Sequence, residues 1–134
     1  MADKTALQPK RFHTAAPLPT DLHVQLLNSI NEAVIATDLS GKVVFWNSVA
    51  ETIYGWKWQE VIGQLITDLV VPPASQQEAA KIMEQLRAGK SWTGPFKVRR
   101  RDGTEFVATV TDRPIRDSRG NLVAIVGVSH PEDG

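Results

Sequence analysis

Apolar residues recur at helical spacing in two stretches of the chain. The first predicts an amphipathic helix with Asp21 as its N-cap, and its apolar stripe consists of Leu22, Leu26, Leu27 and Ile30. The second predicts a longer helix over Gln76–Ala88, with Ser75 as its cap and Gly89 as its stop. The residues that face inward on it are Ala79, Ile82, Met83 and Leu86. Each helix therefore offers one apolar face for packing.

Segments rich in β-branched and aromatic residues predict strands. They cover residues 33–37, 43–46, 92–101, 105–113 and 121–129. Short turns rich in Asp, Ser and Gly join the first two strands to each other and the last three in succession, as in antiparallel hairpins. The predicted fold class is α+β: a five-stranded antiparallel sheet with short helices packed on one face and an N-terminal amphipathic helix.

The segment between the second strand and the long helix predicts short helices. Asn47 follows a strand and can cap a helix that starts at Ser48, and Gly55 reads as its stop. A second short helix, Trp58–Ile62, is closed by Gly63. Pro72 and Pro73 interrupt the apolar run 64–75, which predicts a loop or short turns there.

The pattern also suggests how the chain is divided. Residues 1–20 contain three prolines and no periodicity, which predicts a flexible leader. The single domain is expected over residues 21–130, and residues 131–134 are interpreted as a truncated C-terminal linker. Because proline has no N–H for a ladder hydrogen bond, strand pairing is expected to end by His130, before Pro131.

Composition narrows the function classes. The formal net charge is zero, so no bulk electrostatic attraction to nucleic acid or to an anionic membrane is expected. The chain has no cysteine, which excludes disulfides, thiolate metal sites and cysteine nucleophiles. Its three histidines do not converge on a metal geometry. No segment resembles a membrane span or a secretory signal, and a cytoplasmic location is expected.

The order and spacing of these signals resemble the PAS family of sensory domains. The residues that carry the resemblance in the centre of the chain are Asp38, Gly41, Trp46, Asn47, Ala50, Gly55, Trp56, Glu60, Val61, Ile62 and Gly63. Downstream it continues through Arg101, Asp102, Gly103, Pro114, Ile115, Arg116, Asp117, Gly120 and the strand 123–128. The resemblance covers roughly Leu22 to His130 and implies a small apolar cavity between the sheet and the helices.

Strand parity and the resemblance together select the residues expected to line this cavity. The candidates are Phe45, Ile53, Ile66, Leu69, Ile82, Phe96, Val98, Ala108, Val110, Asp112, Ile125 and Ser129. Parity also places Val123 and Gly127 on that face. The alternative is that these residues are ordinary core. Asp112 is the unusual member, because a buried carboxylate needs a partner, and the candidate partners are Arg113, Arg116 and the last strand's backbone.

The resemblance also allows cofactors to be considered. Flavin-binding photosensory members carry a reactive cysteine shortly after the glycine that Gly63 matches, where this chain has Ile66. Two of the three positions that match their flavin-holding polar residues, Val98 and Ala108, are apolar here, and the third is Ser129. Haem-binding members place a histidine on the long helix, which has none here. We therefore expect no cofactor, neither haem nor flavin, and an unidentified small apolar ligand as the candidate occupant.

Two functions remain open. The first is a sensory domain that serves as input module of a larger bacterial signalling protein, such as a histidine kinase of a two-component system, a cyclic-dinucleotide enzyme or a transcription regulator. The second is a ligand-free protein-interaction module. A homodimer is expected in either case, through the apolar stripe of the first helix, and the output domain of the parent protein is the other expected partner. No convergent acid, base or metal set indicates an enzyme.

Overall fold

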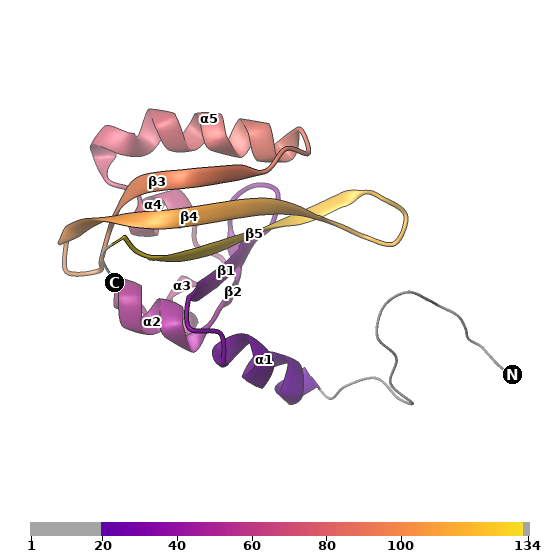
Figure 1. The fold of residues 1–134 in the computed structure, drawn as a ribbon, viewed down its shortest axis with the longest axis horizontal. Helices are drawn as coiled ribbons and strands as arrows, with labels where there is room; N and C mark the ends of the chain where they lie inside the picture. Colours follow the sequence, from indigo (N-terminus) through magenta and orange to yellow (C-terminus); the bar gives the residue numbers. More distant parts are fainter. Residues whose placement is uncertain (1–19, 133–134) are drawn as a thin grey trace, which may run out of the picture.

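The computed structural model describes residues 20–132, and these form a sheet with helices arranged around it (Figure 1). The helices are α1 (Thr20–Asn28), α2 (Ser48–Tyr54), α3 (Trp58–Val61), α4 (Ile66–Val70), the 3-10 turn η1 (Pro73–Ser75) and α5 (Gln76–Arg87). The strands are β1 (Ala33–Thr37), β2 (Val43–Trp46), β3 (Trp92–Arg99), β4 (Glu105–Arg116) and β5 (Leu122–Pro131). The leader predicted over residues 1–20 lies almost wholly outside the described residues, as do the last two residues of the predicted linker.

The sheet has the strand order β2-β1-β5-β4-β3, and every neighbouring pair is antiparallel. Figure 1 shows α5 running along β3 and β4, whereas α1 projects away from the sheet. This arrangement confirms the predicted fold class. The buried core lies between the sheet and the helices and includes Val43, Trp46, Tyr54, Leu86 and Phe96.

Asn47 joins β2 to α2. Its Oδ1 accepts a hydrogen bond from the backbone N–H of Ala50 at 2.9 Å, which confirms it as the N-cap, and a second from Val34 N–H at 3.0 Å. Gly55 ends α2 with a φ of 82°, a left-handed conformation that glycine adopts without steric cost. The local signals that predicted this segment therefore agree with its structure.

The helix ends differ from the predictions in two places. Helix α1 begins at Thr20, so Asp21 lies inside the helix and not at its N-cap. Ser75 makes no side-chain capping bond to α5, because η1 leads directly into that helix with Gln76 already in helical conformation. The region 64–75 contains the short helix α4 and η1, in keeping with the predicted short turns.

Strand β5 runs further than predicted. Pro131 pairs with Ala108, and the N–H of Glu132 donates to the carbonyl of Val107 at 2.9 Å. Since that bond makes Val107 and Glu132 a hydrogen-bonded pair, Pro131 falls at the alternate, non-bonded position, where the ladder with β4 needs no N–H. The expectation that pairing ends by His130 is therefore wrong.

Two irregular positions interrupt the period-two alternation of the strands. Ala36 pairs with Phe45 but Thr37 pairs with Val43, so β2 carries an extra residue. Trp46 and Val43 consequently face inward and are buried, and Phe45 lies opposite Ala36 on the outer face. Likewise, Ile115 pairs with Ala124 and Arg116 with Leu122. Val123 is the extra residue there, and it is exposed.

Within residues 20–132, no helix is both long enough and apolar enough to cross a membrane.

Candidate functional site

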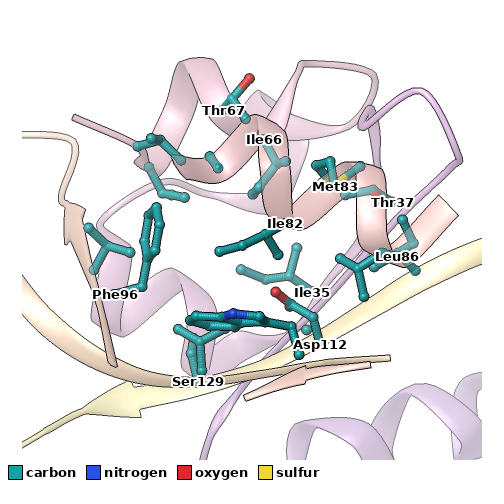
Figure 2. Close-up of a pocket in the computed structure, with 18 of the residues that line it drawn as sticks. Ile35, Thr37, Ile66, Thr67, Ile82, Met83, Leu86, Phe96, Asp112 and Ser129 are labelled. Carbon is teal, nitrogen blue, oxygen red and sulfur yellow. The ribbon is translucent and has the colours of Figure 1, made fainter. Parts of the chain in front are cut away.

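A cavity of about 120 Å³ lies between the inner face of the sheet and helices α4 and α5. Its walls are mainly aliphatic and aromatic. The residues that line it are Ile35, Thr37, Tyr54, Ile66, Thr67, Val70, Val71, Ala79, Ile82, Met83, Leu86, Trp92, Phe96, Val98, Val110, Asp112, Ile125, Gly127 and Ser129. Figure 2 shows Ile82, Met83 and Leu86 descending from one side and Asp112 and Ser129 on the sheet side.

Asp112 brings a carboxylate into this apolar space. It lies on β4 opposite Gly127 of β5, and Figure 2 shows its oxygen turned toward the cavity. Burial raises the pKa of Asp112 to about 6, because the charged form loses its hydration. The predicted partners do not reach it: Arg113 lies on the opposite face of the strand, and the guanidinium of Arg116 donates to the Gly120 carbonyl. In the described part of the chain, Asp112 has no hydrogen-bond or ion-pair partner.

Gly127 allows Asp112 to take this position. A Cβ atom placed on Gly127 would lie 2.5 Å from Asp112 Oδ1, closer than side-chain carbons approach oxygen in proteins. The missing side chain on β5 therefore leaves the space that the carboxylate occupies.

Tyr54 and Ser129 form a hydroxyl pair at the cavity wall. Their oxygens are 2.7 Å apart, and both side chains are buried. Burial raises the pKa of Tyr54, the hydrogen bond to Ser129 opposes this shift, and the charge of Asp112 adds to it. Tyr54 therefore stays a neutral phenol at physiological pH, and the pair links α2 to β5.

Thr37 contributes a further polar atom. Thr37 is 5% exposed, and its Oγ1 has no hydrogen-bond partner among residues 20–132. A buried hydroxyl without a partner is costly. The cavity thus contains polar atoms that the protein leaves available.

Most predicted cavity residues line the cavity. They are Ile66, Ile82, Phe96, Val98, Val110, Asp112, Ile125 and Ser129. The structure places four others elsewhere. Phe45 is turned outward by the irregularity in β2, and α2 reaches the cavity with Tyr54 instead of Ile53. Leu69 and Ala108 are buried in the surrounding core.

Several lining residues were missed. Ile35 and Thr37 share one face of β1, so the parity used for the other strands would have found them. Trp92 shares the face of β3 that carries Phe96 and Val98, so parity would have found it as well. Tyr54 lies on helix α2, to which strand parity does not apply. In the described residues, no group of three or more His, Asp or Glu side chains is placed to hold a metal ion.

The residues predicted to form a dimer interface lie on and just after α1, the helix that projects away from the sheet (Figure 1). Leu26 is 50% exposed and Ile30 is 42% exposed, while Leu22 and Leu27 are half-buried. Ile30 lies beyond the end of α1, in the turn before β1. Asn47 Nδ2 donates to the Leu27 carbonyl at 3.0 Å and so ties the end of α1 to the domain.

Comparison with known proteins identifies a matching family and similar proteins. A family model described as the PAS fold matches residues 22–131. Phototropin-2 of Oryza sativa subsp. japonica is 25% identical over 119 residues, which are 87% of this chain and 13% of that protein. The blue-light photoreceptor of Listeria monocytogenes is 30% identical over 105 residues, 76% of this chain and 42% of that protein. The chain therefore spans less than half the length of these relatives.

Solved structures show the same fold. The PAS domain of a Colwellia psychrerythraea protein superposes with a TM-score of 0.73 at 23% identity, over 83% of this chain and 94% of the other. A Light-Oxygen-Voltage domain studied with a flavin analogue gives a TM-score of 0.71 at 24% identity, over 84% and 87%. The sequence-based prediction of no cofactor is therefore wrong, because the relatives include a phototropin and a blue-light photoreceptor and a matching structure is a Light-Oxygen-Voltage domain studied with a flavin analogue.

Proposed function

Because the chain belongs to the PAS family, as the match over residues 22–131 shows, we propose that it is the input module of a larger signalling protein and senses a molecule held non-covalently in its cavity. The chain is a PAS sensory domain homologous to blue-light photoreceptors. The observation that carries the proposal is the cavity itself, which lies between helices and sheet and contains polar atoms that no side chain satisfies. Ligand pockets have this character: apolar walls with a few placed polar groups.

A larger parent protein is supported by the relatives, of which this chain matches only 13% and 42%. The output domain we propose is one that a bacterial sensor controls, such as a histidine kinase. Within such a parent, this domain would bind and report, and another domain would carry the catalytic activity.

The relatives make a flavin the first cofactor to test against the cavity. The chain has no cysteine, so any flavin would be held without a bond to a thiol. An apolar cavity of roughly 150 Å³ accepts a benzene molecule, and the cavity here measures about 120 Å³. A three-ring flavin therefore does not fit the cavity in this conformation, and it would enter only if the wall formed by α4 and α5 moved outward.

The experiment is to purify the full chain and measure its native mass and absorbance, then titrate it with flavin mononucleotide. Ile82→Phe fills the cavity from α5, and Lys81→Phe adds the same ring on the exposed side of the same helix as the matched control. We expect the wild-type chain to retain a small molecule on purification or to bind flavin mononucleotide in the titration. Ile82→Phe should abolish this binding, and Lys81→Phe should preserve it. Circular dichroism establishes that both variants fold.

A domain that retains nothing, binds no flavin and behaves identically in both variants would refute the sensing proposal. The interaction module would then be the better function. The exposed Leu26 and Ile30 favour that second candidate, because an apolar surface of this kind is commonly covered by a partner.

A further inference from the structure

The carboxylate of Asp112 is a charge for which the cavity provides no counter-charge. No lysine or arginine is among the residues that line the cavity. The aliphatic side chains of Ile82 and Leu86 face it from α5, and the glycine at position 127 leaves it uncovered on β5. Asp112 is half-buried, and a charge without a partner in such a place is unfavourable, so a cation that enters the cavity gains an interaction that the empty protein lacks.

The carboxylate of Asp112 has enough acceptor sites for the N–H donors of an ammonium group. An ammonium group has three N–H donors to satisfy. Asp112 offers two carboxylate oxygens, which together have about four lone-pair sites. Thr37 pairs with Ile125, two strands from Asp112 and two residues along β5 from the Asp112 partner Gly127, so its hydroxyl lies at another part of the cavity wall. The carboxylate is therefore the group that would hold the cation.

The volume of the cavity limits the size of the ligand's hydrocarbon part. The cavity of about 120 Å³ is somewhat smaller than the roughly 150 Å³ that accepts benzene, so it holds a group of about one small ring. The hydrocarbon part of a ligand would pack against Ile82, Leu86 and Phe96. A five-membered carbon ring with one amine has about the bulk of benzene and matches this division between polar and apolar walls.

We propose that the cavity binds a compact organic amine, with its ammonium group on Asp112 and its hydrocarbon part against helix α5. The proposal rests on the proposed function and specifies the ligand class of the same cavity. At pH 7 the carboxyl is mostly ionised, since the pKa of Asp112 is raised only to about 6. The other titratable residue that lines the cavity is Tyr54, whose pKa burial raises, so it stays neutral.

The test compares three probes built on the same five-membered carbon ring, by calorimetry and ligand-observed NMR on the full chain. Cyclopentylamine is the cation, methylcyclopentane the apolar control and cyclopentanecarboxylate the anion. We expect the amine to bind at least about tenfold more tightly than either control, the ratio that a hydrogen bond to a charged group supplies. Between pH 7 and pH 5 its affinity should fall about tenfold, as the carboxyl with a pKa of about 6 becomes protonated.

Variants separate the roles of the residues. Asp112→Asn and Thr37→Val both keep the side-chain shape. Asp112→Asn should weaken amine binding by about tenfold or more, whereas Thr37→Val, two strands away, should leave it nearly unchanged. Neither should change the affinity for methylcyclopentane. Asp68→Asn removes the same charge from the exposed side of α4 and should leave amine binding unchanged.

Each result has a defined meaning. An amine affinity equal to that of methylcyclopentane, or unchanged by Asp112→Asn, overturns the inference. If methylcyclopentane or flavin mononucleotide binds and the amine does not, the inference fails while the sensing function stands. If the chain retains no molecule and binds no probe, both are refuted.

Discussion

Replacing Asn47 with alanine should destabilise this domain more than the loss of an ordinary helix cap. Asn47 is 1% exposed. Its Oδ1 accepts from the backbone N–H groups of Val34 and Ala50, and its Nδ2 donates to the carbonyls of Leu27 and Glu32 at 3.0 Å each. One side chain therefore connects the end of α1, the start of β1 and the first turn of α2.

The magnitude follows from what the substitution leaves behind. A lost N-cap alone costs about 1 kcal/mol. Alanine would also strand the N–H of Val34, which is buried, and each buried donor without a partner costs about 1–3 kcal/mol. The part-buried carbonyls of Leu27 and Glu32 can turn to water. We expect a loss of about 2–4 kcal/mol, which for a domain of this size lowers the melting temperature by roughly 8–16 °C.

The assay is urea and thermal unfolding of the variant and two comparisons. Asn47→Asp keeps the oxygen acceptor but buries a charge and turns an oxygen toward the carbonyls of Leu27 and Glu32, so at neutral pH it should cost at least as much as alanine. Asn28→Ala removes an acceptor for Ser48 N–H at the surface and should cost less than 1 kcal/mol. An Asn47→Ala loss no larger than that of Asn28→Ala would show that these bonds contribute no more than a surface cap.

Three further predictions concern the cavity and α1. Because the folded-state pKa of Asp112 is raised to about 6, the folded protein binds more protons than the unfolded chain between about pH 4 and pH 6. The free energy of unfolding should therefore fall as pH rises through this window, by at most about 3 kcal/mol, and urea titrations of Asp112→Asn should lack that fall. Gly127→Ala places a Cβ 2.5 Å from Asp112 Oδ1 and should cost about 1–3 kcal/mol, with a smaller loss when Asp112 is also alanine in a double-mutant cycle. Replacing Leu26 and Ile30 with glutamate should shift a dimer toward monomer in sedimentation velocity, whereas Val123→Glu, at another exposed apolar position, should not; a wild type that is already monomeric at high concentration would refute the interface.

The fold could be predicted because its signals are local. Turn residues, the cap at Asn47 and the stop at Gly55 each depend on neighbours within a few residues, and the sheet follows from short connections between strands. The strand ends could not be predicted in the same way. Pro131 is tolerated because its position in the register with β4 requires no backbone N–H hydrogen bond. That register is set by the tertiary structure and not by the local sequence.

The cavity shows the limit of strand parity. Parity held for β4 and for residues 125–129 of β5, where pairing is regular, and it failed at Phe45 and Val123, where one strand carries an extra residue. An extra residue inverts the faces beyond it, and nothing in the composition of β2 marks its position. The position of Asp112 followed from parity, but its lack of a partner depends on where distant arginines end, which only the tertiary structure shows.

Strand β5 connects the cavity to the segment that leads to α1. Ser129 faces the cavity and bonds to Tyr54, while the next residue, His130, places its Nδ1 2.6 Å from Glu32 Oε2 on the other face. The Glu32 carbonyl is in turn held by Asn47 Nδ2. A ligand can displace this strand only through a difference in affinity between two strand positions. We expect cyclopentylamine to slow amide hydrogen exchange in β5 and in residues 29–32 as well as at the cavity wall, and Glu32→Gln to remove the effect on residues 29–32 alone. Slowing confined to α5, with β5 and residues 29–32 unchanged, would exclude β5 as the connection.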